Sequence, residues 1–339
     1  MRYPRFKLPD APAFYHCISR VVDRKPCLGE AEKEYFVRLM REYEAFCGVR
    51  VLTYSVMSNH FHILVEVPPR PAVLPTAEEV IERLRGLSSG GETAARAQQM
   101  IQRFRSVHNL AGERAYLEGF YRRMWDVSPF MKALKQRFSN WYNRRNERRG
   151  TLWEERFKSA VVEGAGETLV TMAAYIDLNP VRAGIVQEPQ DYRWCGYAEA
   201  MAGQVSAREG LKIVVAALIG RDVSTESVLE IYRCRLFGQG EERDGTDDRG
   251  RPLRKGFDRA RVLSVIRHRG VVSPAEYVRC RVRYFADGVA LGSRAFVEHF
   301  FQRFHKHFGQ KRPGGARELA GLDLRDFYNL RRFPNGAFG

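Results

Sequence analysis

The stretch MSNHFHILVEV, residues 57–67, places two histidines two positions apart in a run that is otherwise typical of a buried β-strand. Alternate residues of a strand point to the same face, so His60 and His62 present two imidazoles side by side, while Phe61 and Ile63 face the opposite way. Paired imidazoles add nothing to an apolar core, but they suit a divalent cation or a scissile phosphate. The stretch therefore predicts a strand with chemistry on one face.

The segments around this strand predict the rest of a small sheet. Residues 14–22 and 49–56 are rich in β-branched and aromatic side chains, and a further strand is expected at about 157–162. Apolar residues at helical spacing predict helices over 30–46 and 129–147. The order β-α-β-β-α-β is that of a ferredoxin-like α+β unit with an antiparallel sheet, in which the histidine strand is central.

A helical insertion is expected at about residues 70–127. Amphipathic pieces at 77–87 and 92–108 lie on either side of a Ser-Ser-Gly-Gly loop. After the insertion, Ser128 is a good N-cap and Pro129 a good first residue for the next helix.

The chain is expected to have three parts. Residues 1–200 hold the sheet unit, and residues 201–257 form a helical connector that ends in a polar linker. Residues 258–339 are expected to form an α-helical C-terminal domain. Two of its helices, around a Gly-containing turn, suggest a helix-turn-helix-like DNA-binding domain. Its helices are expected near 258–267, 273–284 and 293–308.

Composition points to a polyanionic partner. The formal charge is +16 and the pI is about 9.8, which favours nucleic acid over an anionic membrane, although a merely basic surface is the plain alternative. No apolar run is long enough to span a membrane, and the N-terminus lacks the apolar core of a signal peptide. The six cysteines contain no C-x-x-C pair, so free thiols and a cytoplasmic location are expected.

A second informative stretch is GETLVTMAAYIDLNPVRAG, residues 166–184, whose helix should end near Asn179 because Pro180 follows. Tyr175 and Asn179 are four residues apart and share a helix face. A tyrosine hydroxyl is a poor nucleophile at its usual pKa near 10, but a nearby cation offsets this handicap. Two imidazoles and one side-chain oxygen would suit Mn²⁺ better than Mg²⁺. Equally, Asn179 is a good N-cap for a short helix that starts at Pro180.

Together these stretches resemble the HUH single-tyrosine transposases, and more closely the IS200-like, REP-associated tyrosine transposases. The resemblance covers about residues 13–197, and its motifs are specific in combination. They are SVMSNHFHILVEVP (55–68), MKALKQRFSNWYNRR (131–145), GTLWEERFKS (150–159) and YIDLNPVRAGIV (175–186).

The resemblance implies an activity and its residues. Tyr175 would attack a single-stranded DNA phosphodiester to give a 5′-phosphotyrosine link, and His60 and His62 would bind the divalent metal, Mg²⁺ or Mn²⁺. The DNA would be single-stranded or a hairpin of REP-like palindromic sequence, and the protein a monomer or a homodimer. Insertion-sequence relatives commonly complete the metal site with a glutamine four residues after the tyrosine, and here Asn179 takes that place.

A basic stretch with interleaved aromatic residues predicts the DNA-binding surface. Arginine and lysine follow a phosphate backbone, whereas most of the aromatic side chains are expected to be buried. The predicted DNA-binding residues are Arg122, Arg123, Lys132, Lys135, Arg137, Arg144, Arg145, Arg148, Arg149, Arg156 and Lys158.

Alternative interpretations accompany these predictions. A catalytically silent nucleic-acid-binding regulator could use the same scaffold, and so could a metal-dependent phosphodiesterase in which water attacks. His16 is expected to be a packed or hydrogen-bonded residue and not a ligand. His299, His305 and His307 lie in an amphipathic segment, where solvent or backbone-phosphate contact is expected.

Overall fold

The computed structural model describes residues 5–8, 10–240, 285, 287–308, 312–319 and 327–331. The helices expected near 258–267 and 273–284 lie outside the described residues, as does most of the polar linker. The division of the chain into three domains therefore stays a prediction.

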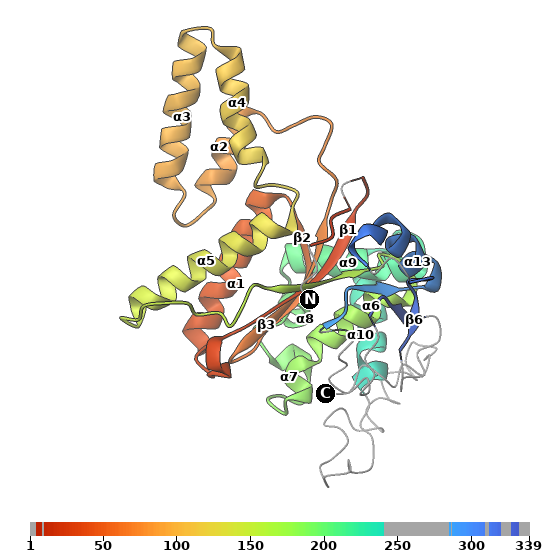
Figure 1. Cartoon of the computed structure of the whole chain (residues 1–339). Helices are drawn as coiled ribbons and strands as arrows, with labels where there is room; N and C mark the ends of the chain where they lie inside the picture. The colour runs from red at the N-terminus through yellow and green to blue at the C-terminus, as the bar shows by residue number, and fades with distance from the viewer. Residues whose placement is uncertain are drawn as a thin grey trace.

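A seven-stranded sheet forms the centre of the molecule, in the order β2-β3-β1-β4-β5-β7-β6 (Figure 1). Its first four strands pair antiparallel in the order of a ferredoxin-like unit, with β3 between β2 and β1. The α+β prediction and the central place of the histidine strand are therefore confirmed. These four strands are β1 (Ala13–Arg20), β2 (Arg50–Val56), β3 (His60–Val67) and β4 (Lys158–Val162).

Helices cover both faces of this sheet. Helices α1 (Glu30–Cys47) and α5 (Val127–Arg145) lie over the face that carries Phe61, where the Phe36 ring is 4.7 Å from the Phe61 ring and 5.3 Å from the Phe138 ring. The other face carries Leu64 and packs against α6 (Gly166–Asp177) and α9 (Val205–Ile219). The strict alternation along β3 separates the two cores, so the histidines share a face with α6.

The expected insertion contains three helices, which project beyond one end of the sheet (Figure 1). Thr76 begins the first of them with a capping box, in which its side chain accepts from the Glu79 amide. The sequence predicted two of these three helices. It did not predict the last one, which begins directly after the second and has Asn109 as its N-cap. They are α2 (Ala77–Arg85), α3 (Gly91–Ser106) and α4 (Leu110–Tyr121).

Helix α5 begins two residues earlier than predicted. Asp126, not Ser128, is its N-cap, and the Asp126 carboxylate accepts a hydrogen bond of 2.8 Å from the Ser128 amide. A carboxylate at this position satisfies a free amide and also interacts favourably with the helix dipole. Ser128 and Pro129 therefore lie within the first turn.

The described C-terminal residues extend the sheet, which the expectation of a separate helical domain did not include. Strand β5 (Ala290–Gly292) pairs parallel with β4 and antiparallel with β7 (Tyr328–Asn329), which pairs with β6 (Arg317–Glu318). Residues 290–292 were expected in the turn of a helix-turn-helix, but they form a strand. The helix predicted after them is present as α13 (Arg294–Arg303), and Ser293 is its N-cap.

Two further findings concern membrane spans and the cysteines. In the described part of the chain, no helix is both long and apolar enough to cross a membrane. Five described cysteines, Cys17, Cys27, Cys47, Cys195 and Cys234, are free thiols, as expected, and Cys280 lies outside the described residues.

Candidate functional site

Tyr175 and the histidine pair meet on one face of the sheet. His60 is half-buried and His62 is 5% exposed, and their ring centroids are 5.1 Å apart. The Tyr175 ring lies 6.1 Å from the His62 ring and is only 2% exposed. Strand β3 and helix α6 therefore bring together the residues that the sequence selected.

His16 belongs to the same cluster. It lies on β1, beside β3, and its Nε2 is 2.9 Å from Nδ1 of His62. Its Nδ1 is 2.9 Å from the carbonyl oxygen of Phe285, whose ring also contacts the Tyr175 ring at 5.1 Å. The expectation that His16 is a buried, hydrogen-bonded residue is confirmed, and its partner is the predicted metal ligand.

The turn after α6 places a cation over the tyrosine. Helix α7 (Asn179–Arg182) follows α6 directly, and the Arg182 guanidinium lies 4.3 Å from the centre of the Tyr175 ring. Arg182 also donates to the Tyr175 carbonyl oxygen at 2.6 Å and to Oδ1 of Asn179 at 2.9 Å. This arginine therefore ties the tyrosine to the next helix.

Asn179 does not take the N-cap role proposed for it. The N-cap of α7 is Leu178, and no side chain makes a capping hydrogen bond there. The Asn179 amide instead donates to the carbonyl oxygen of Ile176 at 3.2 Å. Because Oδ1 accepts from Arg182, its role as a third metal ligand stays a prediction.

Burial keeps the inner imidazoles neutral. Desolvation lowers the pKa of His16 to about 4. Desolvation, with the neighbouring His16 and His60 rings and the Arg182 charge, holds the pKa of His62 well below its ordinary value. A neutral imidazole is the form that binds a metal.

This donor set fits a borderline divalent cation better than a hard one. Two imidazoles favour Mn²⁺ over Mg²⁺, which prefers oxygen ligands. Within the described ranges, no set of three or more His, Cys, Asp or Glu side chains could enclose a metal ion. Two imidazoles alone would leave positions on a cation for phosphate oxygens and water.

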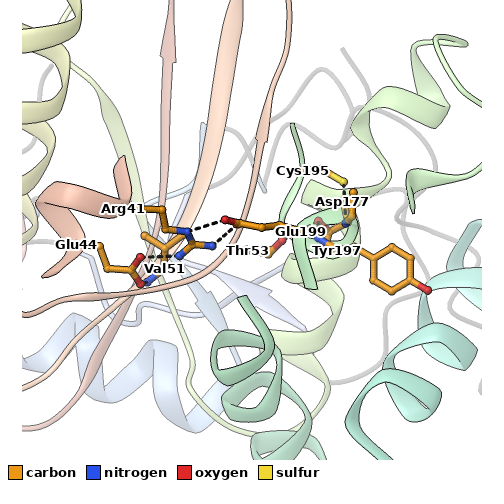
Figure 2. Close-up of polar contacts among 9 residues, drawn as sticks. Arg41, Glu44, Val51, Thr53, Asp177, Cys195, Tyr197 and Glu199 are labelled. Atoms are coloured by element: carbon orange, nitrogen blue, oxygen red, sulfur yellow. Dashed lines mark hydrogen bonds and ion pairs between the residues drawn. The ribbon is translucent and has the colours of Figure 1, made fainter. Parts of the chain in front are cut away.

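A buried carboxylate fixes the end of helix α6, two residues beyond Tyr175 (Figure 2). Asp177 accepts from the Thr53 hydroxyl at 2.7 Å and from the Tyr197 amide at 3.1 Å, and the Tyr232 hydroxyl donates to its other oxygen at 2.5 Å. These donors come from β2, α8 (Gly196–Met201) and α10 (Thr225–Gly240). Burial raises the pKa of Asp177 to about 6.

An ion-pair network continues this anchor across β2 (Figure 2). The Arg41 guanidinium donates to the carboxylates of both Glu44 and Glu199, and Glu44 also accepts from the Val51 amide. Arg41 lies on α1 and Glu199 on α8, so the network joins helices at opposite faces of the sheet. Together the two sets of contacts hold α6 in place relative to β2.

Seven cations gather around a groove of about 1380 Å³ on the α5 side of the sheet. The groove lies between the start of α5, the N-terminal segment and residues 151–157. Its basic side chains are Arg5, Lys7, Arg123, Lys132, Lys135, Arg137 and Arg156.

Most of these cations have no carboxylate partner in the described part of the chain. Lys7 pairs with Asp126, but among the described residues no ion pair includes the other six. Burial and the nearby Arg5 charge lower the pKa of Lys135 to about 8, and burial and Arg156 lower the pKa of Arg5. A group of seven cations, of which only Lys7 has an ion-pair partner among the described residues, is a favourable site for a polyanion.

The aromatic residues of this region are buried, as predicted. Phe138, Trp153 and Phe157 are at most 7% exposed. Lys135 lies 5.3 Å from the Trp153 ring centre, and the Arg5 guanidinium 3.4 Å from that of Phe157. The rings therefore support the cations and offer little surface on which bases could stack.

One wall of the groove lies at the same end of the sheet as the histidine site, although on the opposite face. Trp153 forms a bridge with Val21, and the Glu154 amide donates to the Arg20 carbonyl at 2.9 Å. Arg20 is the residue opposite His60 in the β1–β3 pair. Neighbouring strands are about 4.8 Å apart, so the groove and the imidazoles lie at the same end of the sheet.

The structure divides the predicted DNA-binding residues into two groups. Arg123, Lys132, Lys135, Arg137 and Arg156 line the groove. Lys158 pairs with Asp287 at 2.8 Å, and Arg145 lies 3.7 Å from Glu32. The predicted residues that do not line the groove are Arg122, Arg144, Arg145, Arg148, Arg149 and Lys158.

Sequence reasoning missed Arg5, Lys7 and Arg182. The first two belong to a basic N-terminal segment, and only the fold brings them to α5. Arg182 lies inside the stretch that resembles the transposases, so its charge seven residues after Tyr175 was the available signal.

Comparisons with known proteins agree with the resemblance. Residues 12–110 match the family model described as "Transposase IS200 like", so the resemblance to these transposases is confirmed. No curated protein matches the chain. One similar solved structure, "Structure of the REP associates tyrosine transposase bound to a REP hairpin", is 12% identical, with a TM-score of 0.38; the match covers 60% of this chain and 86% of that chain.

Proposed function

We propose, with the IS200-like transposase match over residues 12–110 as the premise, that this protein cleaves and rejoins single-stranded DNA through Tyr175. The observation that carries the proposal is the 6.1 Å distance between the Tyr175 and His62 rings within one chain. The tyrosine oxygen would attack the phosphorus, the bond to the 3′ oxygen would break, and the phenol proton would end on the released 3′-hydroxyl. The phosphodiester energy stays in the 5′-phosphotyrosine, so rejoining needs no ATP.

Each residue of the cluster has a part in this reaction. His60 and His62 would hold Mn²⁺ or Mg²⁺, whose chemistry when bound is to polarise the scissile phosphate. Arg182, over the Tyr175 ring, would bind a phosphate oxygen and favour the negative charge that develops on the phenol. The Asp177 anchor would keep Tyr175 aligned with the histidines.

Tyr175 must become accessible for this attack. Its side chain is 2% exposed, and Phe285 and Arg182 contact its ring. Movement of either group would uncover it, and a DNA phosphate that attracts Arg182 away from Asn179 would also release the Asn179 oxygen for a metal.

The basic groove supplies the DNA contacts of the proposal. Its unpaired cations suit a phosphate backbone, and its buried rings suit contact without base stacking, as in the paired stem of a hairpin. Because the wall at Glu154 is bonded to Arg20 beside His60, the groove and the histidines share one end of the sheet. A single strand that leaves a stem in the groove would pass around this end to reach the histidines on the opposite face. A REP-like hairpin with a single-stranded flank is therefore the proposed substrate.

The burial of Tyr175 also favours a second candidate, a catalytically silent DNA-binding regulator. Such a protein would use the groove and leave the tyrosine covered. It would bind a hairpin without forming a covalent adduct.

A labelled hairpin with a single-stranded flank, incubated with the full chain and Mn²⁺, tests the proposal on a denaturing gel. The transposase gives a protein–DNA adduct that is lost in Tyr175→Phe. Tyr197→Phe is the matched control, because the Tyr197 side chain is also fully buried and its hydroxyl has no hydrogen-bond partner among the described residues. Hairpin binding without an adduct supports the regulator, and cleavage without an adduct indicates attack by water.

A further inference from the structure

We infer that Asn59 and His16 are positioning residues, which hold His60 and His62 in the same tautomer, with the proton on Nδ1 and the electron pair on Nε2. The structural part of this inference depends only on hydrogen-bond chemistry. Its consequence for metal binding rests on the proposed function.

The tautomer of His60 follows from the orientation of Asn59. The Asn59 amide nitrogen donates to the Arg24 carbonyl oxygen at 2.9 Å, so this contact fixes which end of the side chain is oxygen. Oδ1 of Asn59 then lies 2.7 Å from Nδ1 of His60. An amide oxygen can only accept, so Nδ1 of His60 carries the proton and donates.

The tautomer of His62 follows from a chain of two hydrogen bonds. The Phe285 carbonyl can only accept, so Nδ1 of His16 carries a proton and donates to it. In the neutral His16 ring, Nε2 is then the acceptor, and Nδ1 of His62 must donate to it. The proton of His62 is therefore on Nδ1, as it is in His60.

His60 and His62 thus have the same Nδ1-protonated tautomer, although their hydrogen-bond partners are unrelated. One partner is a loop amide anchored on a backbone carbonyl, and the other is a buried histidine, 1% exposed, also anchored on a carbonyl. In the described part of the chain, Nε2 of His62 makes no hydrogen bond. A ligand imidazole normally donates its second ring N–H to such an acceptor, which fixes the ring and raises its basicity.

A purely structural role for His16 makes a different prediction. If His16 only filled space, any side chain of similar volume would serve, and the state of the His62 ring would not change. The inferred role requires an acceptor atom at the place of Nε2.

Nitrogen-15 NMR of the metal-free full chain tests the tautomers directly. With labelled histidine, and with His60→Gln and His62→Gln to assign the signals, both rings should show a protonated Nδ1 and an unprotonated Nε2. A protonated Nε2 in either ring overturns the inference for that ring. This result is independent of any DNA cleavage, so it separates failure of the inference from failure of the proposed function.

Matched variants test the role in binding, with Mn²⁺ as the probe and free Mn²⁺ measured by electron paramagnetic resonance. His16→Phe keeps a ring but removes the acceptor, so it should shift His62 toward the Nε2–H form and weaken Mn²⁺ binding about 10–100-fold. His16→Gln keeps a carbonyl acceptor and an amide donor for Phe285, and should restore most of the affinity.

Two variants of Asn59, which lies in a half-buried loop, give an independent test in case His16→Phe does not fold. Asn59→Asp keeps an acceptor for His60, and Asn59→Leu does not. The inference would be overturned in favour of packing alone if His16→Phe and His16→Gln changed the tautomer and the Mn²⁺ affinity equally. The same holds if Asn59→Asp and Asn59→Leu had equal effects.

Discussion

The ring centroids of Tyr175 and His62 lie 6.1 Å apart within one chain, although one residue is on α6 and the other on β3. A single protomer therefore contains both the proposed nucleophile and a proposed metal ligand. Asp177 and its three donors hold this arrangement, since they fix the end of α6 to β2, α8 and α10.

The first prediction is that the site works in cis. Tyr175→Phe and His62→Ala should each abolish the DNA adduct, and a mixture of the two variants should form no more adduct than either alone. The reason is that each chain of the mixture lacks one half of its own site. The measurement is the adduct yield on a denaturing gel. Recovery of adduct in the mixture would show that the tyrosine acts on the histidines of a partner chain.

The second prediction concerns the metal. Removal of divalent cations with a chelator should abolish adduct formation and leave hairpin binding nearly unchanged, because the groove binds DNA through its own cations. Mn²⁺ should restore the reaction at lower concentration than Mg²⁺, because two imidazoles favour the softer ion. Adduct yields across a titration of each metal provide the check. Full activity in the presence of chelator would exclude a metal role for His60 and His62.

The third prediction concerns the groove. Lys135→Ala and Arg156→Ala should each weaken hairpin binding whatever the stem sequence. Each should also reduce the steepness of log Kd against log salt concentration by about one, which corresponds to the loss of one phosphate contact. The measurement is a series of dissociation constants at several salt concentrations. Arg144→Ala is the control, because Arg144 is exposed but does not line the groove. An equal loss in the control would place the DNA along α5 generally and not in the groove.

The fourth prediction follows from the raised pKa of Asp177, about 6 against an ordinary 3.8. Since the folded protein holds this proton more tightly than the unfolded chain, the Asp177 contribution to the free energy of unfolding falls as pH rises from about 4 to 6. It stays low above that range. The shift corresponds to about 3 kcal/mol at most.

Asp177→Asn removes this titration, so the variant should gain stability relative to the original protein between pH 4 and pH 7. Denaturant unfolding at the two pH values measures the difference. Asp191→Asn, at an exposed position, serves as the control. A difference for Asp177→Asn that does not change with pH would mean that burial does not raise the pKa of this carboxyl.

Local patterns in the sequence were enough to predict the central sheet and the shared face of His60 and His62, and the resemblance added Tyr175. Alternation along β3 places His60 and His62 on one face, and α6, the helix that follows the β-α-β-β-α-β unit, packs on that face. Strands β5, β6 and β7 could not be predicted, because segments of two or three residues carry no alternation. Arg5 reaches the groove, and His16 reaches His62, only through tertiary contacts that no sequence spacing encodes.

The identity of the residue that carries the DNA is the most direct test of the account. The adduct formed with a hairpin and Mn²⁺ would be digested with protease and nuclease, and the modified peptide sequenced by mass spectrometry. If Tyr175 is the nucleophile, the nucleotide is joined through its 5′ phosphate to Tyr175, on the peptide that contains residues 166–182. A nucleotide on another tyrosine, or cleaved DNA with no modified peptide, would contradict the account.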